Sequence, residues 1–339
     1  MRRRKIWIAI IGTLALVIIW QWDFIRYGLR LAEGQIEVIV NAKPIEDFLA
    51  APDFPDSLKS KLRLAQEVRL FAMEELKLNH SDNYTKLYDQ KGKVLIWNVS
   101  ACEPYKLEPY KWYFPFLGKM PYKGFFDLEE AKLERAQLDE LGLDTRIRPV
   151  GGWSTLGILN DPILSNMLNR SDGDLAEVII HELTHATIFV KNEIEFNENL
   201  ASFIGERGAE LFLAQQFGDS SEAYLDYIQS QSDGRRLTEY ILLGARTLDS
   251  LYSHIENQPD SVRKTLKGKA IDSIVDAMDT VSFYNEKYYN IFRKTSPNNA
   301  YFMSFMRYHA QEDTLSTIYN HYDDNLKKMI EALKDEYGK

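Results

Sequence analysis

Cysteine is almost absent from this sequence, which has only Cys102 among its 339 residues. A single cysteine rules out a disulfide within the chain, but a chain of this length can bury a stable core without one. The scarcity of cysteine also limits which side chains can bind a metal ion. A cysteine-rich zinc site is excluded, which leaves histidine and carboxylate side chains as the available ligands.

Positive charge is also scarce in the chain. Lys and Arg number 41 against 50 Asp and Glu, a formal net charge of −9, and four of the basic residues stand together at residues 2–5. Neutralising phosphates requires clustered Lys and Arg, so we predict that nucleic acid is not a partner. Repeats and low-complexity segments are lacking, and the 45% hydrophobic content is typical of a globular protein with an acidic, soluble surface.

Only one long hydrophobic run is present, at residues 6–20, directly after the basic residues 1–5. It ends in Trp20 and Trp22, without the small residues of a signal-peptidase site and without a lipobox cysteine. A cleaved signal peptide is the alternative. We expect instead that residues 1–22 are cytoplasmic basic residues and a transmembrane signal anchor, which contacts the membrane through residues 6–22. The protein would then be single-pass, with residues 23–339 as one extracytoplasmic (periplasmic) domain.

The pattern after the anchor predicts helices, then a few strands, then mostly helices. Apolar residues recur at three- and four-residue steps in residues 55–78, as in an amphipathic helix. Residues 93–100 and 145–150 read as strands, because branched, aromatic or alternating apolar side chains dominate them. Other helices are expected at residues 24–42, at residues 128–141 and over most of the chain after residue 174. This order predicts a mostly helical α+β fold with a small sheet.

One five-residue string carries the clearest chemistry: His181 and Glu182, then two residues, then His185, an HExxH motif on a predicted helix. Positions i and i+4 of a helix point the same way, so both histidines can present a ring nitrogen to one Zn²⁺. Glu182 is rotated by about 100° from His181, which keeps it beside the metal as a general base. Asp172 or Asp174 is the expected N-cap.

The alternative is a histidine pair with no metal. Apolar residues surround the motif on several faces, which indicates a buried helix, and buried histidines and glutamates require partners. The metal interpretation is therefore favoured.

A hydrolytic zinc site normally has three protein ligands, so one acid must come from elsewhere. The nearest are Glu193, Glu195, Glu198 and Glu206. We expect Glu198, because Asn197 could cap a second helix there and small residues follow that would let two helices approach closely. Glu206 is the second choice. HExxH on one helix and NExxA on the next is the pattern of a glutamate zincin.

The substrate site is less well defined by the sequence. Zincins bind an extended substrate along a strand beside the active-site helix, and residues 145–150 are the candidate. The glycines that follow would allow a peptide backbone to approach closely, although they could equally form a simple turn. The candidate substrate-binding residues are Gly152, Trp153, Ser154, Asn298 and Asn299, and the candidate for stabilising the oxyanion is Tyr308.

Together these residues resemble a bacterial family described as predicted aminopeptidases, a glutamate-zincin group. The resemblance is carried by residues 27, 34–35, 97–101, 112, 114–115, 118, 121–126, 154–157, 161–162, 181–185, 196–198 and 298–300. It implies Zn²⁺ on His181, His185 and Glu198, with Glu182 as the base. Two departures are the missing lipoprotein cysteine and Trp153, where the family more usually has Tyr.

We therefore predict a zincin-like metallopeptidase with a small sheet beside the HExxH helix and an N-terminal transmembrane helix. Its expected function is that of a zinc-dependent peptidase acting on peptides or proteins, an aminopeptidase, at the outer face of the bacterial inner membrane. An aminopeptidase needs a carboxylate for the substrate ammonium, and Glu193, Glu195 and Glu206 are all conceivable. The alternatives are a zinc endopeptidase acting on envelope proteins and a non-catalytic scaffold with the zincin fold.

Overall fold

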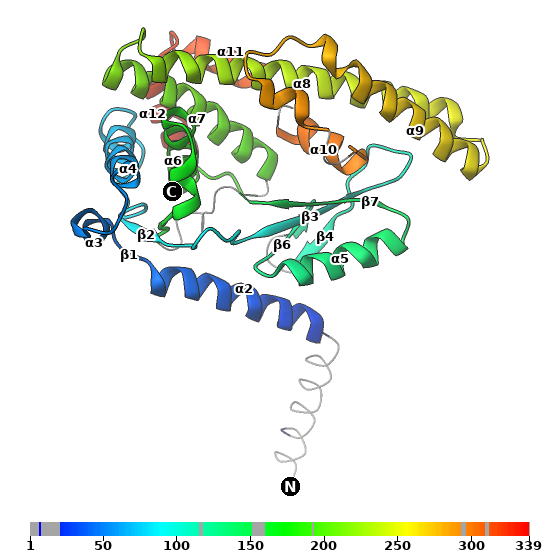
Figure 1. The fold of residues 1–339 in the computed structure, drawn as a ribbon, viewed down its shortest axis with the longest axis horizontal. Helices are drawn as coiled ribbons and strands as arrows, with labels where there is room; N and C mark the ends of the chain where they lie inside the picture. Colours follow the sequence, from blue (N-terminus) through cyan, green and yellow to red (C-terminus); the bar gives the residue numbers. More distant parts are fainter. Residues whose placement is uncertain are drawn as a thin grey trace.

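Most helices form a thick layer on one side of a small β-structure, and α2 (Trp22–Asn41) and α5 (Leu128–Glu140) lie on its other side (Figure 1). The computed structural model describes residue 7 and residues 21–114, 118–150, 160–191, 193–292, 296–308 and 312–338. Its helices are α2 (Trp22–Asn41), α3 (Ile45–Ala50), α4 (Asp56–Glu74), α5 (Leu128–Glu140), α6 (Asp172–Thr187), α7 (Ile194–Phe217), α8 (Glu222–Ile255), α9 (Asp260–Asp276), α10 (Asn299–Tyr308), α11 (Glu312–His321) and α12 (Leu326–Tyr337). Its strands are β1 (Lys43–Pro44), β2 (Lys86–Tyr88), β3 (Trp97–Cys102), β4 (Trp112–Phe114), β5 (Gly118–Met120), β6 (Lys123–Phe125), β7 (Asp144–Pro149) and β8 (Ile163–Leu164).

The β-structure consists of small, separate sheets. The antiparallel sheet β6-β3-β7 pairs Val99 of β3 with Ile147 of β7. Helix α5 covers the face to which Ile147 points, whereas Arg146, the preceding residue, bonds Ser304 of α10 on the opposite face. In the sheet β1-β2-β8, strand β8 leads through the 3-10 turn Ser165–Asn169 directly into α6.

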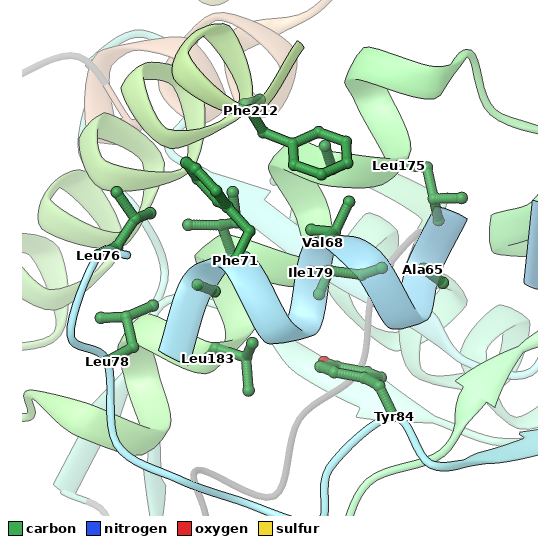
Figure 2. Packing of buried hydrophobic residues seen from close by; sticks show 14 of the residues in the cluster. Ala65, Val68, Phe71, Leu76, Leu78, Tyr84, Leu175, Ile179, Leu183 and Phe212 are labelled. Atoms are coloured by element: carbon green, nitrogen blue, oxygen red, sulfur yellow. The ribbon is translucent and has the colours of Figure 1, made fainter. Parts of the chain in front are cut away.

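The largest core cluster joins α4, α6 and α7. Figure 2 shows Val68 and Phe71 of α4 among side chains of α6 such as Ile179, with Phe212 of α7 beside Phe71. The rings of Phe71 and Phe212 meet edge to face, with their centroids 5.4 Å apart. The apolar spacing of α4 that the sequence shows is thus used to bury α6, the helix that carries the HExxH motif.

Two glycines of α7 allow this helix to lie against α6 with little space between them. A Cβ atom at Gly205 would be 3.0 Å from the carbonyl oxygen of Glu177 and 3.2 Å from the Cβ of His181. A Cβ atom at Gly208 would be 3.0 Å from the side chain of Ile180. A Cβ atom would therefore crowd the backbone of α6 at Gly205, and at Gly208 it would require neighbouring side chains to shift.

A second core cluster lies between α8, α9 and α10. The fully buried Asp233 of α8 fixes the segment after α9, because its carboxylate accepts the backbone N–H groups of Tyr284 (2.9 Å) and Asn285 (2.8 Å). Helix α10 also contacts the sheet, since the Nδ2 of Asn298 donates to the backbone carbonyl of Thr145 at 2.8 Å. This bond links the helical layer to β7.

The expected mostly helical α+β composition with small sheets is present, and β7 matches the strand expected at residues 145–150. The N-terminal transmembrane helix is corrected. No helix within the described ranges has the length and apolar character needed to cross a membrane. Residues 8–20 lie outside those ranges, and α2, which follows them, carries Arg26, Arg30, Glu33 and Glu37, more charge than a span tolerates. The predicted location, single-pass and extracytoplasmic, is corrected for the same reason. The predicted division of the chain into residues 1–22 and residues 23–339 stays a prediction.

We predict that Gly205→Ala destabilises the protein by about 1–3 kcal/mol, because the new methyl group meets the α6 backbone. The matched control is Gly234→Ala in α8, where a Cβ atom would have no neighbour within 4 Å. That variant should be stabilised by about 0.5–1 kcal/mol, since alanine is the better helix former. Urea unfolding measures both, and a Gly205→Ala protein as stable as the control would contradict the close helix contact.

Candidate metal centre

The HExxH helix α6 begins at a well-defined polar contact. Its N-cap is Ser171, whose Oγ accepts the backbone N–H of Asp174 at 3.1 Å. The expected caps, Asp172 and Asp174, instead lie in the first turn, where their charge favours the positive end of the helix dipole. Asp172 also pairs with Lys61 of α4 at 2.5 Å.

Three side chains from α6 and α7 converge on one point. The Nε2 atoms of His181 and His185 are 3.1 Å apart. The carboxylate of Glu198 reaches both, at 3.8 Å from Nε2 of His181 and 3.6 Å from Nε2 of His185. One ligand atom from each residue falls within a group no wider than 4.8 Å. Ligands on a tetrahedral zinc lie roughly 3.4 Å apart, so this spacing suits a metal ion.

The surroundings of His181 leave its imidazole able to bind a cation. Burial lowers the pKa of His181 from 6.5 to about 4, so its imidazole is neutral at pH 7 and has a lone pair to offer. His185 is almost fully buried, with 5% of its side chain exposed, whereas Glu198 is 25% exposed. The group is therefore accessible to solvent from the Glu198 side.

Glu198 is placed by its neighbour Asn197. The structure starts α7 at Ile194, so Asn197 is inside the helix and is not the cap suggested by the sequence. Its buried amide donates to the carbonyl of Val190 and accepts the N–H of the same residue, both at 2.8 Å. This pair of bonds fixes the connection between α6 and α7, and with it the direction in which Glu198 points.

Other acids predicted near the site lie in different surroundings. Glu193 and Glu195, at the start of α7, are exposed, and Glu206 is half-buried two turns beyond Glu198. Sequence reasoning missed Glu177, which lies one turn before His181 and accepts hydrogen bonds from the hydroxyl of Tyr227 at 2.9 Å and from Gln231 at 2.7 Å. Burial raises the pKa of Glu177. Its four-residue spacing from His181 was the available signal.

The predicted substrate residues are less well placed. Gly152, Trp153 and Ser154 lie outside the described residues. Asn298 bonds β7, and the fully buried Asn299 accepts the hydroxyl of Tyr252 at 2.6 Å and donates to the carbonyl of Glu103 at 2.8 Å. Their contacts are thus with the protein itself, and a role in substrate binding stays a prediction. Tyr308 is the last residue of α10, and its side chain is outside the described part of the chain.

A comparison with protein-family models extends this local picture to the whole chain. The family described as "Putative aminopeptidase" matches residues 26–336. The chain belongs to this aminopeptidase family. Membership identifies it, at a coarse level, as a peptidase whose substrates are peptides or proteins. No curated protein sequence and no solved structure was found to match the chain.

The lowered pKa of His181 predicts that acid destabilises the metal-free protein. The unfolded chain takes up a proton at this residue near pH 6.5, whereas the folded protein does so only near pH 4, so stability falls as the pH drops between these values. Urea unfolding at pH 7 and pH 5 should show wild type losing about 2 kcal/mol more than His181→Gln, which lacks the titrating group. An equal loss in both proteins would show that the pKa of His181 is not lowered.

Proposed function

We propose that the chain is a zinc-dependent aminopeptidase in which His181, His185 and Glu198 hold the metal and Glu182 is the general base. The observation that carries the proposal is the convergence of three ligand atoms from two helices within 4.8 Å. Membership in an aminopeptidase family supports the same reaction class. Neither argument depends on the other, because the first uses only the geometry of α6 and α7.

The donor set fits zinc better than Ca²⁺ or Mg²⁺. Two imidazole nitrogens and one carboxylate form the usual protein ligand set of a hydrolytic zinc site, whereas Ca²⁺ and Mg²⁺ prefer oxygen ligands alone. When bound, zinc would lower the pKa of a water molecule to about 7 and polarise the scissile carbonyl group. Three protein ligands leave one coordination position for that water.

Glu182 is suited to moving the proton. It follows His181 directly on α6, and only 9% of it is exposed, so few water molecules compete for its carboxylate. In the proposed reaction Glu182 accepts the proton from the attacking water and then donates it to the leaving amine. The cleaved peptide bond is thereby replaced by a carboxylate and a free amine.

Removal of one residue at a time from a peptide requires recognition of its free N-terminus. A carboxylate near the metal normally binds the substrate ammonium, and the candidates besides Glu198 are two acids of α7 and the acid just before that helix. Glu193 and Glu195 are exposed close to Glu198, and Glu206 is half-buried on the same helix. The proposal that the chain is an exopeptidase is supported by its membership in the aminopeptidase family.

We expect the purified full chain to bind one zinc ion, measured by mass spectrometry of its metal content. Glu198→Ala should lose that zinc, because two histidines alone bind it weakly. Glu206→Ala is the matched control, a half-buried acid of the same helix, and should retain zinc. Glu182→Gln should also retain it while slowing peptide hydrolysis by roughly 10²–10⁴-fold.

No zinc in the wild-type protein, even after refolding with metal, would rule out the zinc peptidase. Full loading without hydrolysis of any peptide would instead indicate a non-catalytic scaffold.

Blocking the substrate's N-terminus should separate an aminopeptidase from an endopeptidase. We expect unmodified peptides to be shortened from the first residue, and N-acetylated copies of the same peptides to resist, because they lack the ammonium group. Mass spectrometry of the products measures both. Internal cleavage of the acetylated peptides at the same rate would replace the aminopeptidase by an endopeptidase and leave the zinc site untouched.

A further inference from the structure

Tyr84 has a backbone conformation that a bulky residue rarely adopts. Its φ angle is +62°, in the left-handed region where the Cβ atom of an L-residue crowds the backbone. Such strain persists only where the surrounding structure enforces it, and it is concentrated at functional sites. Tyr84 therefore needs an explanation beyond packing, since a phenylalanine or leucine in a relaxed conformation could also fill a core.

The surrounding structure does enforce this conformation. The backbone N–H of Tyr84 donates to the carbonyl of Asp161 at 2.7 Å, and the backbone N–H of Asp161 donates to Oδ1 of Asn83 at 2.9 Å. From α4, the guanidinium of Arg69 bonds the carbonyl of Asn83 at 2.9 Å and also the carbonyl of Ser81. Two segments far apart in the sequence are thus joined around Tyr84, which gives Asp161 a structural role.

The hydroxyl group of Tyr84 lies buried in the core. Tyr84 is 1% exposed, and its hydroxyl forms no hydrogen bond with any residue in the described ranges. The ring belongs to the same core cluster as Ile179 and Leu183 of α6, as Figure 2 shows. Glu182 comes three residues after Ile179, so both side chains lie on the same side of α6, one turn apart. Tyr84 therefore packs on the part of α6 that carries Glu182.

The charges around Tyr84 agree with this placement. Burial raises the pKa of the Tyr84 hydroxyl well above 10, and the negative charges of Glu182 and Asp161 raise it further. The hydroxyl is therefore protonated and can donate a hydrogen bond. Of the two carboxylates that act on it, Glu182 is the one beside the group of His181, His185 and Glu198.

We propose that Tyr84 is a positioning residue for Glu182: its buried hydroxyl, which has no hydrogen-bond partner among the described residues of this structure, donates to the Glu182 carboxylate in the metal-loaded protein and holds it towards the metal centre. The proposal rests on the function proposed above. Catalytic hydrogen bonds are often long without substrate and shorten when the reacting groups are in place. A carboxylate held from behind by a buried donor keeps its other oxygen free for the proton it must accept.

Tyr84→Phe tests the proposal, because it removes the hydroxyl and keeps the ring. With the zinc-loaded full chain and a free peptide, we expect kcat to fall at least tenfold while KM changes less than twofold and zinc content is unchanged. The control is Tyr240→Phe, which removes the hydroxyl of a half-buried tyrosine, one that bonds the backbone carbonyl of Ile274 in the second core. It should leave kcat within twofold of wild type. An unchanged kcat in Tyr84→Phe would overturn the proposal while the peptidase function stands.

A double-mutant cycle with Glu182→Gln adds a test that needs no activity. The equilibrium constants of unfolding of zinc-loaded wild type, Tyr84→Phe, Glu182→Gln and the double variant are measured in urea. If the hydroxyl acts on Glu182, the combined effect should differ from the product of the single effects by about fivefold or more. Independent effects would overturn the proposal. Coupling in a protein that hydrolyses no peptide would remove the proposed function but retain the contact between the two residues.

Discussion

The close contact between α6 and α7 is the constraint on which the rest of the structure depends. The HExxH motif supplies two histidines from one helix, but Glu198 comes from the next, and the helices can approach closely because Gly205 and Gly208 present no side chain to α6. The two bonds between Asn197 and Val190 fix how the chain turns from one helix to the other. Helix α4 then covers α6 with apolar residues and keeps the contact dry.

The polar groups around this contact are costly to bury, and their partners explain much of the neighbouring structure. Glu177 is balanced by donors from α8, a helix that packs in both core clusters. Asn83 and Asp161 support each other and hold Tyr84 in its strained conformation. Buried polar groups without hydrogen bonds destabilise a fold, so these partners offset part of the cost of burying polar groups beside α6. The apolar clusters supply the stability that offsets this cost.

The sheet has a supporting part in this arrangement. Strand β7 pairs with β3 on one side and is bonded to Asn298, just before α10, and through Arg146 to Ser304 of α10, so these bonds join the helical layer to the sheet. An extended peptide could add to a sheet edge by backbone hydrogen bonds, which is why the sequence suggested this strand for substrate binding. The structure shows instead how firmly β7 is held, and the substrate's position along it stays a prediction.

The sequence by itself determined the mostly helical α+β composition and the buried helix with HExxH, because both follow from periodicity or spacing within a few residues. It also suggested Glu198 as the third acid, and the structure places Glu198 near both histidines, whereas its role as a metal ligand stays a prediction. It was wrong about the transmembrane helix, since apolar composition in a short run does not establish a span. Only the tertiary structure decided the distances between the three ligand atoms, the role of Asn197 and the place of Tyr84. These depend on contacts between residues far apart in the chain: Tyr84 meets Asp161 and α6 only after folding, and no local pattern marks a left-handed tyrosine.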